Sequence, residues 1–428
     1  MRLTLTSMDE YFLHFLWKFQ KFNSRPLLTE DGQELIVFKP GYSHDHAGPD
    51  FEEARIKIAD IVWNGPIEIH YRSSDWFAHG HETNEKYDQI ILHVVWVIDK
   101  PVYYKSGKLI PTFVLKDYVD QNLTDAYRHY INQPEDILCS SYQVQNISWI
   151  QLKDQAIARR LESRSMEIND IRKQVGGDWE ETAYRLLCRN MGFSVNKEPF
   201  VRLSEVLPFR ILKKHANNIF QIEALIFGQA GFLEDLSNDY QKELSKEFDF
   251  LKTKYGLKAP LHKTQWLFLR LRPANFPSVR LSQLAGFIHS NTNIFSWMTQ
   301  LNVTDLKKSP NCTTSSYWDG HYDFGKPLKS GQNNFGVNSW QNIVINTSVP
   351  LLCAYSNHVD DQEMYARAID LLTYMKPEEN KITKNWKKLN LKIDNALDSQ
   401  ALIHQYRAYC LKKRCLQCNI GVNILQHS

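Results

Sequence analysis

The sequence of 428 residues has no stretch near the roughly 18 apolar residues that a membrane-spanning helix needs. It also lacks the basic segment and small-residue cleavage site of an export signal, since Asp9 and Glu10 precede the first apolar run. The net charge is only +3, from 51 basic and 48 acidic residues, so no overall field draws the chain to nucleic acid or membrane. These absences predict a cytoplasmic protein without a membrane partner, in which any nucleic-acid site is a local patch.

Cysteine is scarce, with seven residues, and the count is odd. An odd count without an export signal indicates reduced thiols rather than a disulfide framework. Three of the cysteines lie close together, at Cys410, Cys415 and Cys418. Thiolates at this spacing suit zinc or an iron–sulfur cluster, and they match the first three ligands of a plant-type ferredoxin. The fourth ligand would be His427 or a distant cysteine. The simpler alternative is three reduced cysteines at the end of a helix.

Hydrophobic residues (43%) and charged residues (23%) are present in ordinary amounts, so a globular protein of two or three domains is expected. Strand-like alternation dominates the first part of the chain, and helical spacing dominates from about Trp149. We therefore predict an α+β protein. Its parts are a β-rich domain with a mixed sheet and a helix at 1–118, a connector at 119–148, a helical domain at 149–306, a long loop at 307–336 and a helical C-terminal region at 337–428.

Local signals predict individual elements. A capping box at Ser7–Glu10 predicts a helix that ends near Phe22. Asp31-Gly32 and Asn64-Gly65 predict turns, and the continuously apolar segment 90–98 predicts a central strand buried on both faces. Further helices are predicted at 149–174, 179–191, 217–235, 239–255, 279–300, 339–356, 361–375 and 397–414. In the helix at 217–235, the glycines are expected to permit close packing.

Histidines and carboxylates are concentrated between residues 44 and 93. Six of the fifteen histidines lie there, interleaved with six carboxylates: His44, His46, His70, His79, His81 and His93, with Asp45, Asp50, Glu68, Asp75, Glu82 and Asp88. Neutral imidazoles and ionised carboxylates are the groups that a divalent metal or an acid–base mechanism uses near neutral pH. The alternative is that these groups cap turns and lie on a solvated sheet face.

Strand alternation sharpens this prediction. In the segment 66–71, Glu68 and His70 share one face, about 7 Å apart by the strand rise, so both can reach one ion or one water molecule. Asp50 supplies a carboxylate nearby in sequence, and the loop that holds Asp75, His79 and His81 is expected to fold over the same place. His93 differs, because it lies within an apolar strand and is expected to be a hydrogen-bonded core histidine.

The order of these residues resembles the PD-(D/E)xK nuclease superfamily, in which an Asp after Pro begins one strand and an acid-x-Lys lies on the next. Here Pro49-Asp50 is followed eighteen residues later by Glu68-Ile69-His70. The resemblance implies that Asp50 and Glu68 are metal ligands. The sequence departs from the pattern at His70, where a lysine is expected, and a histidine would ligate the metal or relay a proton instead.

Arg270, Arg272 and Arg280 surround a Pro-Ala-Asn-Phe-Pro turn before a predicted helix. Arginines at a helix N-terminus suit a phosphate or carboxylate, so these three are candidate phosphate-binding residues. The alternative, which we favour, is that they pair with acids across a domain interface.

Longer motifs run through nearly the whole chain. They are Gly48-Pro49-Asp50-Phe51, Trp63-Asn64-Gly65, Glu68-Ile69-His70, Ser74-Asp75-Trp76, His79-x-His81, Leu92-His93-Val94-Val95, residues 223–233, residues 270–280 and residues 409–421. Together these motifs resemble the bacterial family labelled "domain of unknown function 2851", whose members are associated with the Bacteroidetes group. The resemblance implies one architecture from end to end and names no activity.

Three functions remain open on these grounds, and the sequence does not establish that the protein is an enzyme. The leading hypothesis is a hydrolase of phosphodiesters, with nucleic acid as the partner and Mg²⁺, Mn²⁺ or Zn²⁺ as the ion. Asp50 and Glu68 would hold the ion, His70 would ligate or act as base, and His79 or His81 would assist the leaving group. The second is a non-catalytic protein whose same face binds nucleic acid or a protein partner, with Trp63, Tyr71 and Trp76 as stacking or anchor residues. The third is an assembly factor, and the oligomeric state is left open.

Overall fold

A computed structural model of the protein describes residues 10–23, 25–43, 48–328 and 335–426. The chain forms two compact units. Unit 1 consists of Met1–Lys153 together with His404–Ser428, and unit 2 consists of Asp154–Ile403. The capping box predicted at Ser7–Glu10 lies mostly outside the described residues. None of the helices in the described ranges has the length and apolar character needed to cross a membrane.

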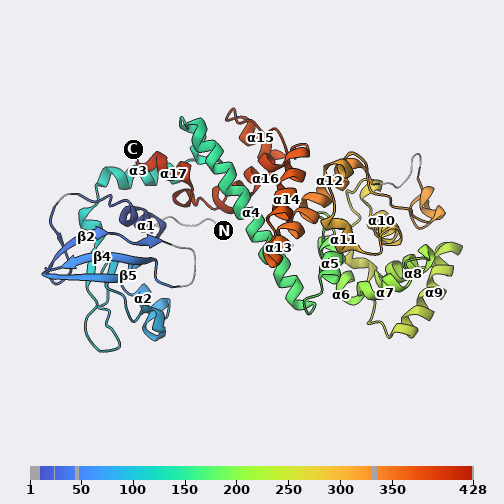
Figure 1. The fold of residues 1–428 in the computed structure, drawn as a ribbon, viewed down its shortest axis with the longest axis horizontal. Coiled ribbons are helices and arrows are strands. Elements are labelled where there is room, and N and C mark those ends of the chain that lie inside the picture. Colours follow the sequence, from blue (N-terminus) through green and yellow to red (C-terminus); the bar gives the residue numbers. More distant parts are fainter. Residues whose placement is uncertain (1–9, 24, 44–47, 329–334, 427–428) are drawn as a thin grey trace. The chain divides into compact units, whose positions relative to one another are not determined.

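The predicted α+β class is confirmed, because unit 1 contains a mixed sheet and most of the chain after it is helical (Figure 1). The sheet has seven strands in the order β1-β2-β4-β5-β6-β7, with β3 beside β4. Strands β1 to β5 pair antiparallel, whereas β5–β6 and β6–β7 pair parallel. The strands are β1 (Leu27–Leu28), β2 (Glu34–Lys39), β3 (Tyr42–Ser43), β4 (Phe51–Ile58), β5 (Ile61–Arg72), β6 (Leu92–Val97) and β7 (Thr112–Val114).

The two faces of β5 have different roles. Ile67 and Ile69 face a hydrophobic core to which α1 (Glu10–Lys18) contributes buried aromatic residues. Glu68 and His70 face the other way, and Glu68 lies opposite His93 in the parallel register of β5 and β6. Because opposite residues in neighbouring strands share a face, the three polar side chains are brought together on one side of the sheet. The alternation predicted for this segment is confirmed.

One predicted turn is wrong. Strand β5 runs unbroken through Asn64-Gly65, and the chain reverses earlier, at Ala59–Asp60. A Cβ atom on Gly65 would lie 2.6 Å from Cγ2 of Ile91, so the glycine permits close approach of the neighbouring chain rather than a turn. The hairpin at Asp31-Gly32 is confirmed by the antiparallel pairing of β1 and β2. The predicted central strand is confirmed as β6, which lies between β5 and β7.

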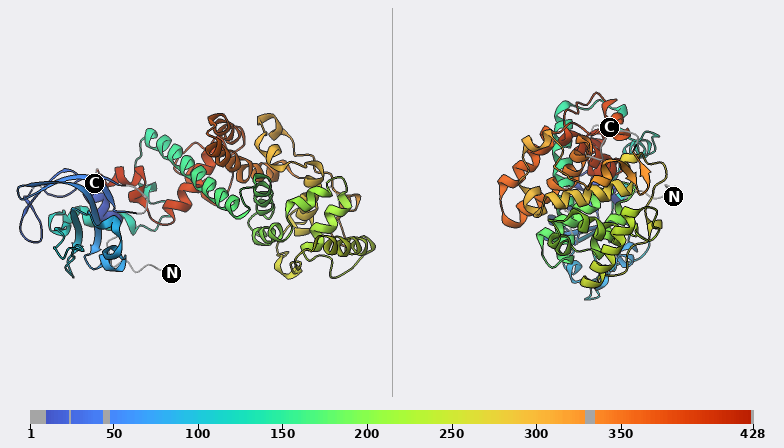
Figure 2. Two further views of the ribbon diagram at one scale, coloured as in Figure 1. Left: turned by 60° about the horizontal axis from the view of Figure 1, so that its bottom comes forward. Right: turned by 90° about the vertical axis from the view of Figure 1, so that its right-hand side faces the viewer.

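The end of the chain returns to unit 1. There α17 (Asn419–Gln426) contacts α3 (Gln121–Ile131) and the 3-10 turn Leu138–Ser141. Figures 1 and 2 show α17 beside α3. The segment that we predicted as a connector therefore contains a helix and a turn, and both hold the C-terminal segment.

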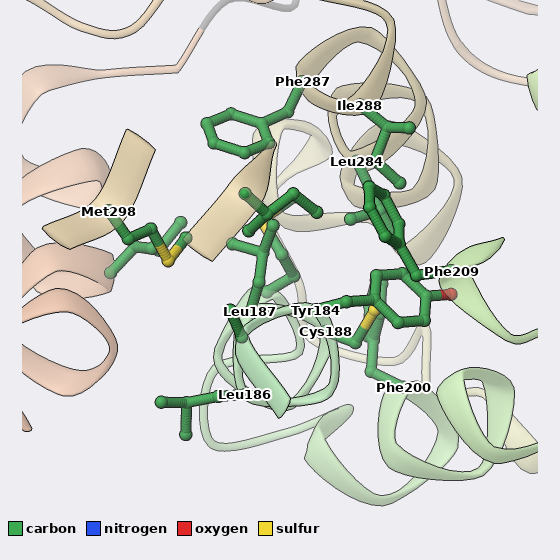
Figure 3. Close-up of a cluster of buried hydrophobic side chains, with 14 of the residues drawn as sticks. Tyr184, Leu186, Leu187, Cys188, Phe200, Phe209, Leu284, Phe287, Ile288 and Met298 are labelled. Carbon is green, nitrogen blue, oxygen red and sulfur yellow. The ribbon is translucent and has the colours of Figure 1, made fainter. Parts of the chain in front are cut away.

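Unit 2 is built from helices around one hydrophobic core. Figure 3 shows part of this core, where Tyr184 and Cys188 lie close to Phe209 and Leu284. The helices are α4 (Asn146–Gln174), which begins in unit 1, and α5 (Trp179–Met191), α6 (Lys197–Val206), α7 (Phe209–Lys214), α8 (Ile219–Gln229), α9 (Asp239–Tyr255), α10 (Pro277–Ser290), α11 (Ile294–Thr299), α12 (Val337–Asn346), α13 (Ser348–Val359), α14 (Gln362–Tyr374), α15 (Lys381–Lys387) and α16 (Ala396–Gln405). The segment predicted as a long loop contains a small hairpin of β8 (His321–Asp323) and β9 (Lys326–Pro327).

Two of the predicted helices are each two helices in the structure. The helix predicted at 279–300 is broken between α10 and α11, where the Asn291 side chain donates a hydrogen bond to the Phe287 carbonyl at 2.9 Å. The helix predicted at 339–356 is broken at Thr347, whose hydroxyl accepts a hydrogen bond from Asn190. Asn291 bonds to the helix backbone and Thr347 to a side chain of another helix, and hydrophobic periodicity detects neither contact. The close packing expected of α8 is confirmed, because a Cβ on Gly228 would lie 2.2 Å from the Phe248 ring.

Candidate metal centre

The histidines of the candidate site come from β5 and from the segment that follows it. After β5, the short helix α2 (Asp75–Ala78) is followed by Gly80, which has a φ of +71°. This left-handed conformation is rarely adopted by residues other than glycine. It reverses the chain so that His79 and His81, on either side of Gly80, turn towards His70. Trp76 of α2 is buried beneath them, with its ring centroid 5.3 Å from that of His81.

Three imidazoles converge at this position. His70, His79 and His81 offer ligand atoms that all lie within 4.8 Å of one another. Nε2 of His70 lies 3.2 Å from Nδ1 of His79. His70 is 1% exposed and His81 is 8% exposed, whereas His79 is open to solvent. Within the described part of the chain, this histidine triad is the group of metal-ligating side chains compact enough to surround one ion.

Glu68 completes the cluster. Its Oε1 lies 3.0 Å from Nε2 of His81 and 3.6 Å from Nε2 of His70, and the side chain is only 4% exposed. Its Oε2 accepts a hydrogen bond from the backbone N–H of Asp50 at 3.1 Å. Glu68 and His70 therefore point to one place, as their spacing in the sequence predicts. Within the described residues, no lysine or arginine pairs with Glu68.

Asp50 lies beside Glu68 and contacts the backbone of β5, and its role as a metal ligand stays a prediction. Its Oδ2 accepts a hydrogen bond from the backbone N–H of Ile69 at 2.9 Å and lies 3.3 Å from Nε2 of His14 on α1. Burial alone would lower the pKa of His14, but the hydrogen bond and charge of Asp50 outweigh it and raise that pKa. Asp50 thus ties the start of β4 to β5 and α1. No sequence signal indicated His14, because its contact with Asp50 joins residues that are distant in the chain.

His93 positions His70. Its Nε2 lies 2.8 Å from Nδ1 of His70, and the side chain is completely buried. If Nδ1 of His70 carries the ring proton and donates a hydrogen bond to His93, Nε2 of His70 has a free lone pair. That lone pair lies on the side of the ring where His79 and His81 converge. His93 is confirmed as a hydrogen-bonded core histidine, and its partner turns out to be a residue of the candidate site.

Burial determines the charge state of the cluster. Burial, together with the neighbouring His93, His81 and His79, lowers the pKa of His70 to about 2. Burial likewise lowers the pKa of His93 to about 3. Burial and the charge of Asp50 raise the pKa of Glu68 to about 9. Neutral imidazoles with free lone pairs, beside a carboxyl group that lacks a permanent cation, form an environment that favours a divalent cation.

Comparison with protein families identifies the chain. Residues 10–381 match the model of the family described as "Protein of unknown function (DUF2851)". The chain belongs to this family. The family resemblance drawn from the motifs is therefore confirmed, and the matched range ends before the cysteines at 410–418. No curated protein and no solved structure matched the chain.

The remaining candidates near the site of this DUF2851 protein have other surroundings. Asp75 accepts a hydrogen bond from the backbone N–H of Arg72 at 2.8 Å, so it stabilises the turn before α2. Trp76 is 2% exposed, so its ring is not open to stack on a ligand at the surface. Trp63 is exposed. His44, Asp45 and His46 lie outside the described residues.

A cavity of about 200 Å³ adjoins the histidine triad. His81 lines it together with Trp76, Tyr87 and Lys105. Tyr87 stacks on His81 with ring centroids 3.7 Å apart. Lys105 forms an ion pair with Asp88 at 2.9 Å. A ligand in this cavity would contact the imidazole of His81 on one side and a cationic side chain on the other.

The three arginines predicted to bind phosphate do not share one environment. Arg270 and Arg272 are exposed, whereas Arg280 is buried. The Arg280 guanidinium donates hydrogen bonds to Gln283 at 2.8 Å and to Asn275 at 2.6 Å, and burial lowers its pKa to about 10. The interpretation that Arg280 pairs with an acid is wrong, because its partners are side-chain amides. Phosphate binding by these arginines stays a prediction.

Cys410, Cys415 and Cys418 lie in unit 1, directly before α17, the helix that contacts the turn Leu138–Ser141. That turn contains Cys139. The sequence left the identity of a fourth ligand open between a distant cysteine and His427, and His427 lies outside the described residues.

Proposed function

We propose that the protein is a metal-dependent hydrolase in which His70, His79 and His81 hold a divalent ion and Glu68 lies beside it. The observation that carries this proposal is the convergence of three ligand atoms within 4.8 Å of one another, next to a buried carboxyl group. Three protein ligands leave one position for water or substrate in a tetrahedral site, which is the arrangement of catalytic zinc centres.

Ligand chemistry favours zinc or another transition metal over magnesium. Imidazole suits zinc, whereas magnesium prefers oxygen ligands. With metal–nitrogen bonds of about 2.1 Å, two ligands at a tetrahedral angle lie about 3.4 Å apart. The 3.2 Å between Nε2 of His70 and Nδ1 of His79 is close to this spacing.

In this function the residues have separate roles. A bound divalent ion lowers the pKa of its water molecule to about 7 and so supplies a nucleophile at neutral pH. The positive charge would also lower the pKa of Glu68, leaving a carboxylate that can accept a proton from the water. His93 holds the His70 ring through the 2.8 Å hydrogen bond, and Asp50 fixes Glu68 through its backbone N–H.

A phosphodiester, with nucleic acid as its source, is the substrate class that we propose. In support, Asp50 directly precedes β4 and Glu68 lies on the adjoining β5, the order that led to the comparison with PD-(D/E)xK nucleases. His70 occupies the lysine position of that pattern and belongs to the histidine triad. The cavity beside His81 includes Lys105, a cation suited to a phosphate oxygen. The alternative of a stacking surface for nucleic acid is less well supported, because Trp76 is buried.

The test uses the purified full-length chain. Metal content is measured in wild type, His81→Ala and Glu68→Gln, and cleavage of bis(p-nitrophenyl) phosphate and of DNA is assayed with Zn²⁺, Mn²⁺ or Mg²⁺. We expect about one ion per chain in this site for wild type, its loss in His81→Ala, and at least about 100-fold slower cleavage with retained metal in Glu68→Gln. His129→Ala, which removes an exposed imidazole on α3, is the matched control and should behave as wild type.

Two results would contradict the proposal in different ways. Metal content that is the same in His81→Ala and wild type would exclude the histidine triad as the binding site. A wild-type protein that holds its ion but cleaves no phosphodiester with any of the three metals would exclude the proposed substrate class.

A further inference from the structure

The cysteine-bearing tail is fastened to one short segment of unit 1. Nζ of Lys413 donates a hydrogen bond to the Ile131 carbonyl at 2.6 Å, and Asn419 donates one to the Ser148 carbonyl at 3.3 Å. Tyr130 and Cys415 share a side-chain hydrogen bond. These contacts hold residues 410–419 against residues 130–148, the stretch that contains Cys139.

The tail is folded tightly around its own cysteines. Lys413 has a φ of +54°, which turns the chain between Cys410 and Cys415, and the backbone N–H of Cys418 bonds to the Cys415 carbonyl at 3.0 Å. A Cβ on Gly421 would lie 2.3 Å from the Cys415 carbonyl oxygen, so α17 packs directly on this turn. The spacing Cys410-x4-Cys415-x2-Cys418 is therefore closed into a compact loop.

The four thiols affect one another. Burial raises the pKa of the Cys139 thiol, and Cys418 and Cys415 raise it further. Burial raises the pKa of Cys410 too, and the largest additional effect there comes from Cys139. Each of these cysteines is a free thiol and half-buried. Cys139 lies in the turn that α17 contacts, and α17 begins directly after Cys418, so packing brings Cys139 to the C-terminal cysteines as the fourth cysteine.

We infer that Cys139, Cys410, Cys415 and Cys418 hold a four-iron, four-sulfur (4Fe–4S) cluster that fastens the C-terminal segment to the turn Leu138–Ser141. Four thiolates are the complete ligand set of such a cluster. The inference is independent of the hydrolase proposal, because it involves none of the histidines.

The spread of the sulfur atoms favours a cluster over a single zinc ion. Around one zinc with Zn–S bonds of about 2.3 Å, the sulfur atoms lie only about 3.8 Å apart. Within the described chain the histidine triad is the group of three ligand atoms that lie within 4.8 Å of one another, so no three of these thiols form so compact a group. In a 4Fe–4S cluster each cysteine binds a different iron, which requires wider spacing. Lys412, Lys413 and Arg414 provide positive charge beside the anionic cluster.

The cluster would serve as a structural link. Cys139 and the C-terminal cysteines lie on either side of residues 154–403 in the sequence, so joining them closes a very long loop of chain. Closing a long loop has a high entropic cost, and ligand bonds to a shared cluster offset that cost. No electron transfer is required for this role.

The experiment measures iron and acid-labile sulfide in the full-length protein, purified without oxygen and, separately, after reconstitution of wild type with ferrous iron and sulfide. We expect about four of each per wild-type chain, visible absorption of an iron–sulfur cluster, and loss of most of the iron in Cys139→Ser and in Cys418→Ser. The matched control is Cys353→Ala, which removes a buried thiol of unit 2 and should keep the full cluster.

If wild type held zinc and no sulfide after both preparations, the proposed iron–sulfur cluster would be wrong. If Cys139→Ser held as much iron and sulfide as wild type, Cys139 would not be the fourth ligand. Chelation provides a readout that does not depend on variants folding: removing iron from wild type should lower its thermal midpoint, and an unchanged midpoint would overturn the structural role.

Discussion

Unit 1 contains two groups of side chains that we propose as metal ligands, and the two groups are assembled in different ways. The histidine triad comes from residues 70–81, a single short segment joined to the sheet. The four cysteines come from a turn near Cys139 and from the end of the chain. The first group is positioned by strand geometry and one left-handed glycine, whereas the second needs tertiary contacts to bring Cys139 to the loop that holds the other three cysteines. The comparison teaches that local geometry can prepare a site for chemistry, whereas long-range ligands are suited to fastening segments together.

The two groups also differ in whether their side chains must lose a proton before they bind a metal. Burial lowers the pKa of His70 to about 2 and also lowers the pKa of His81, so these two imidazoles hold no proton to displace at neutral pH. Burial raises the pKa of Cys415 to about 11, so the thiols must release protons when they ligate a metal. A metal can therefore enter the histidine site in mild acid, whereas assembly at the cysteines is opposed by acid.

The largest effect should appear on acidification of the metal-free protein. Unfolded His70 and His93 bind protons below about pH 6.5, whereas the folded protein keeps them neutral down to about 2 and 3. The unfolded state binds more protons in this range, so each histidine reduces stability by up to about 1.4 kcal/mol per pH unit as the pH falls below 6.5. Glu68, whose pKa is raised to about 9, has the opposite effect between pH 4.5 and 6.5, because in this range it is protonated only in the folded state. Its contribution cancels the loss of stability that one of the two histidines causes.

Urea denaturation of the apo protein between pH 4 and 8 measures this slope. His93→Gln should reduce the slope of unfolding free energy against pH by about 1.4 kcal/mol per pH unit, which corresponds to one proton. Cys415→Ser should leave the slope unchanged, because these thiols are protonated in both states throughout this range. If Cys415→Ser changed this slope and His93→Gln did not, the difference in protonation between the two groups would be the reverse of the one described above.

The next largest effect concerns the ligands themselves. His70→Ala should weaken zinc binding at the triad by more than about 100-fold, since removing a ligand exceeds the 10- to 100-fold cost of altering its hydrogen-bond partner. Iron bound at the cysteines should be unchanged. Calorimetric titration with zinc and parallel iron analysis measure both, with His129→Ala as the control. Loss of both metals together would show that the two groups are not independent.

A smaller effect is expected at the residue that positions the triad. His93→Leu should weaken zinc binding by about 10- to 100-fold, because His70 loses the 2.8 Å hydrogen bond that orients its ring. His93→Gln, which can still exchange a hydrogen bond with His70, should recover part of the affinity. Equal losses in the two variants would mean that His93 acts through packing and not through its hydrogen bond.

The smallest effect tests the local geometry of the triad. Gly80→Ala should reduce stability by about 1 kcal/mol, because an L side chain is strained at the φ of +71° even though the space around it is open. Gly336→Ala is the matched control, with open space and a φ of −69°. Thermal denaturation compares the two. Equal stabilities would indicate that the segment around Gly80 is free to relax.

Prediction from the sequence succeeded where a pattern is local. Alternation in β5 placed Glu68 and His70 on one face, and the apolar run at 90–98 identified β6. It failed at Asn64-Gly65, where the dipeptide is typical of a turn but a close contact with Ile91 requires the glycine. It also failed at Arg280, because the sequence does not reveal that amide side chains, rather than acids, surround that guanidinium.

The sequence by itself determined the α+β class, the faces of β5 and the supply of imidazoles around Gly80, because each depends on spacing within a few residues. Only the tertiary structure decided that His14 reaches Asp50, that His93 orients His70 and that Cys139 lies with the C-terminal cysteines. These contacts depend on how whole segments pack together. That packing is determined by the burial free energy of many apolar residues along the chain, which no short motif specifies.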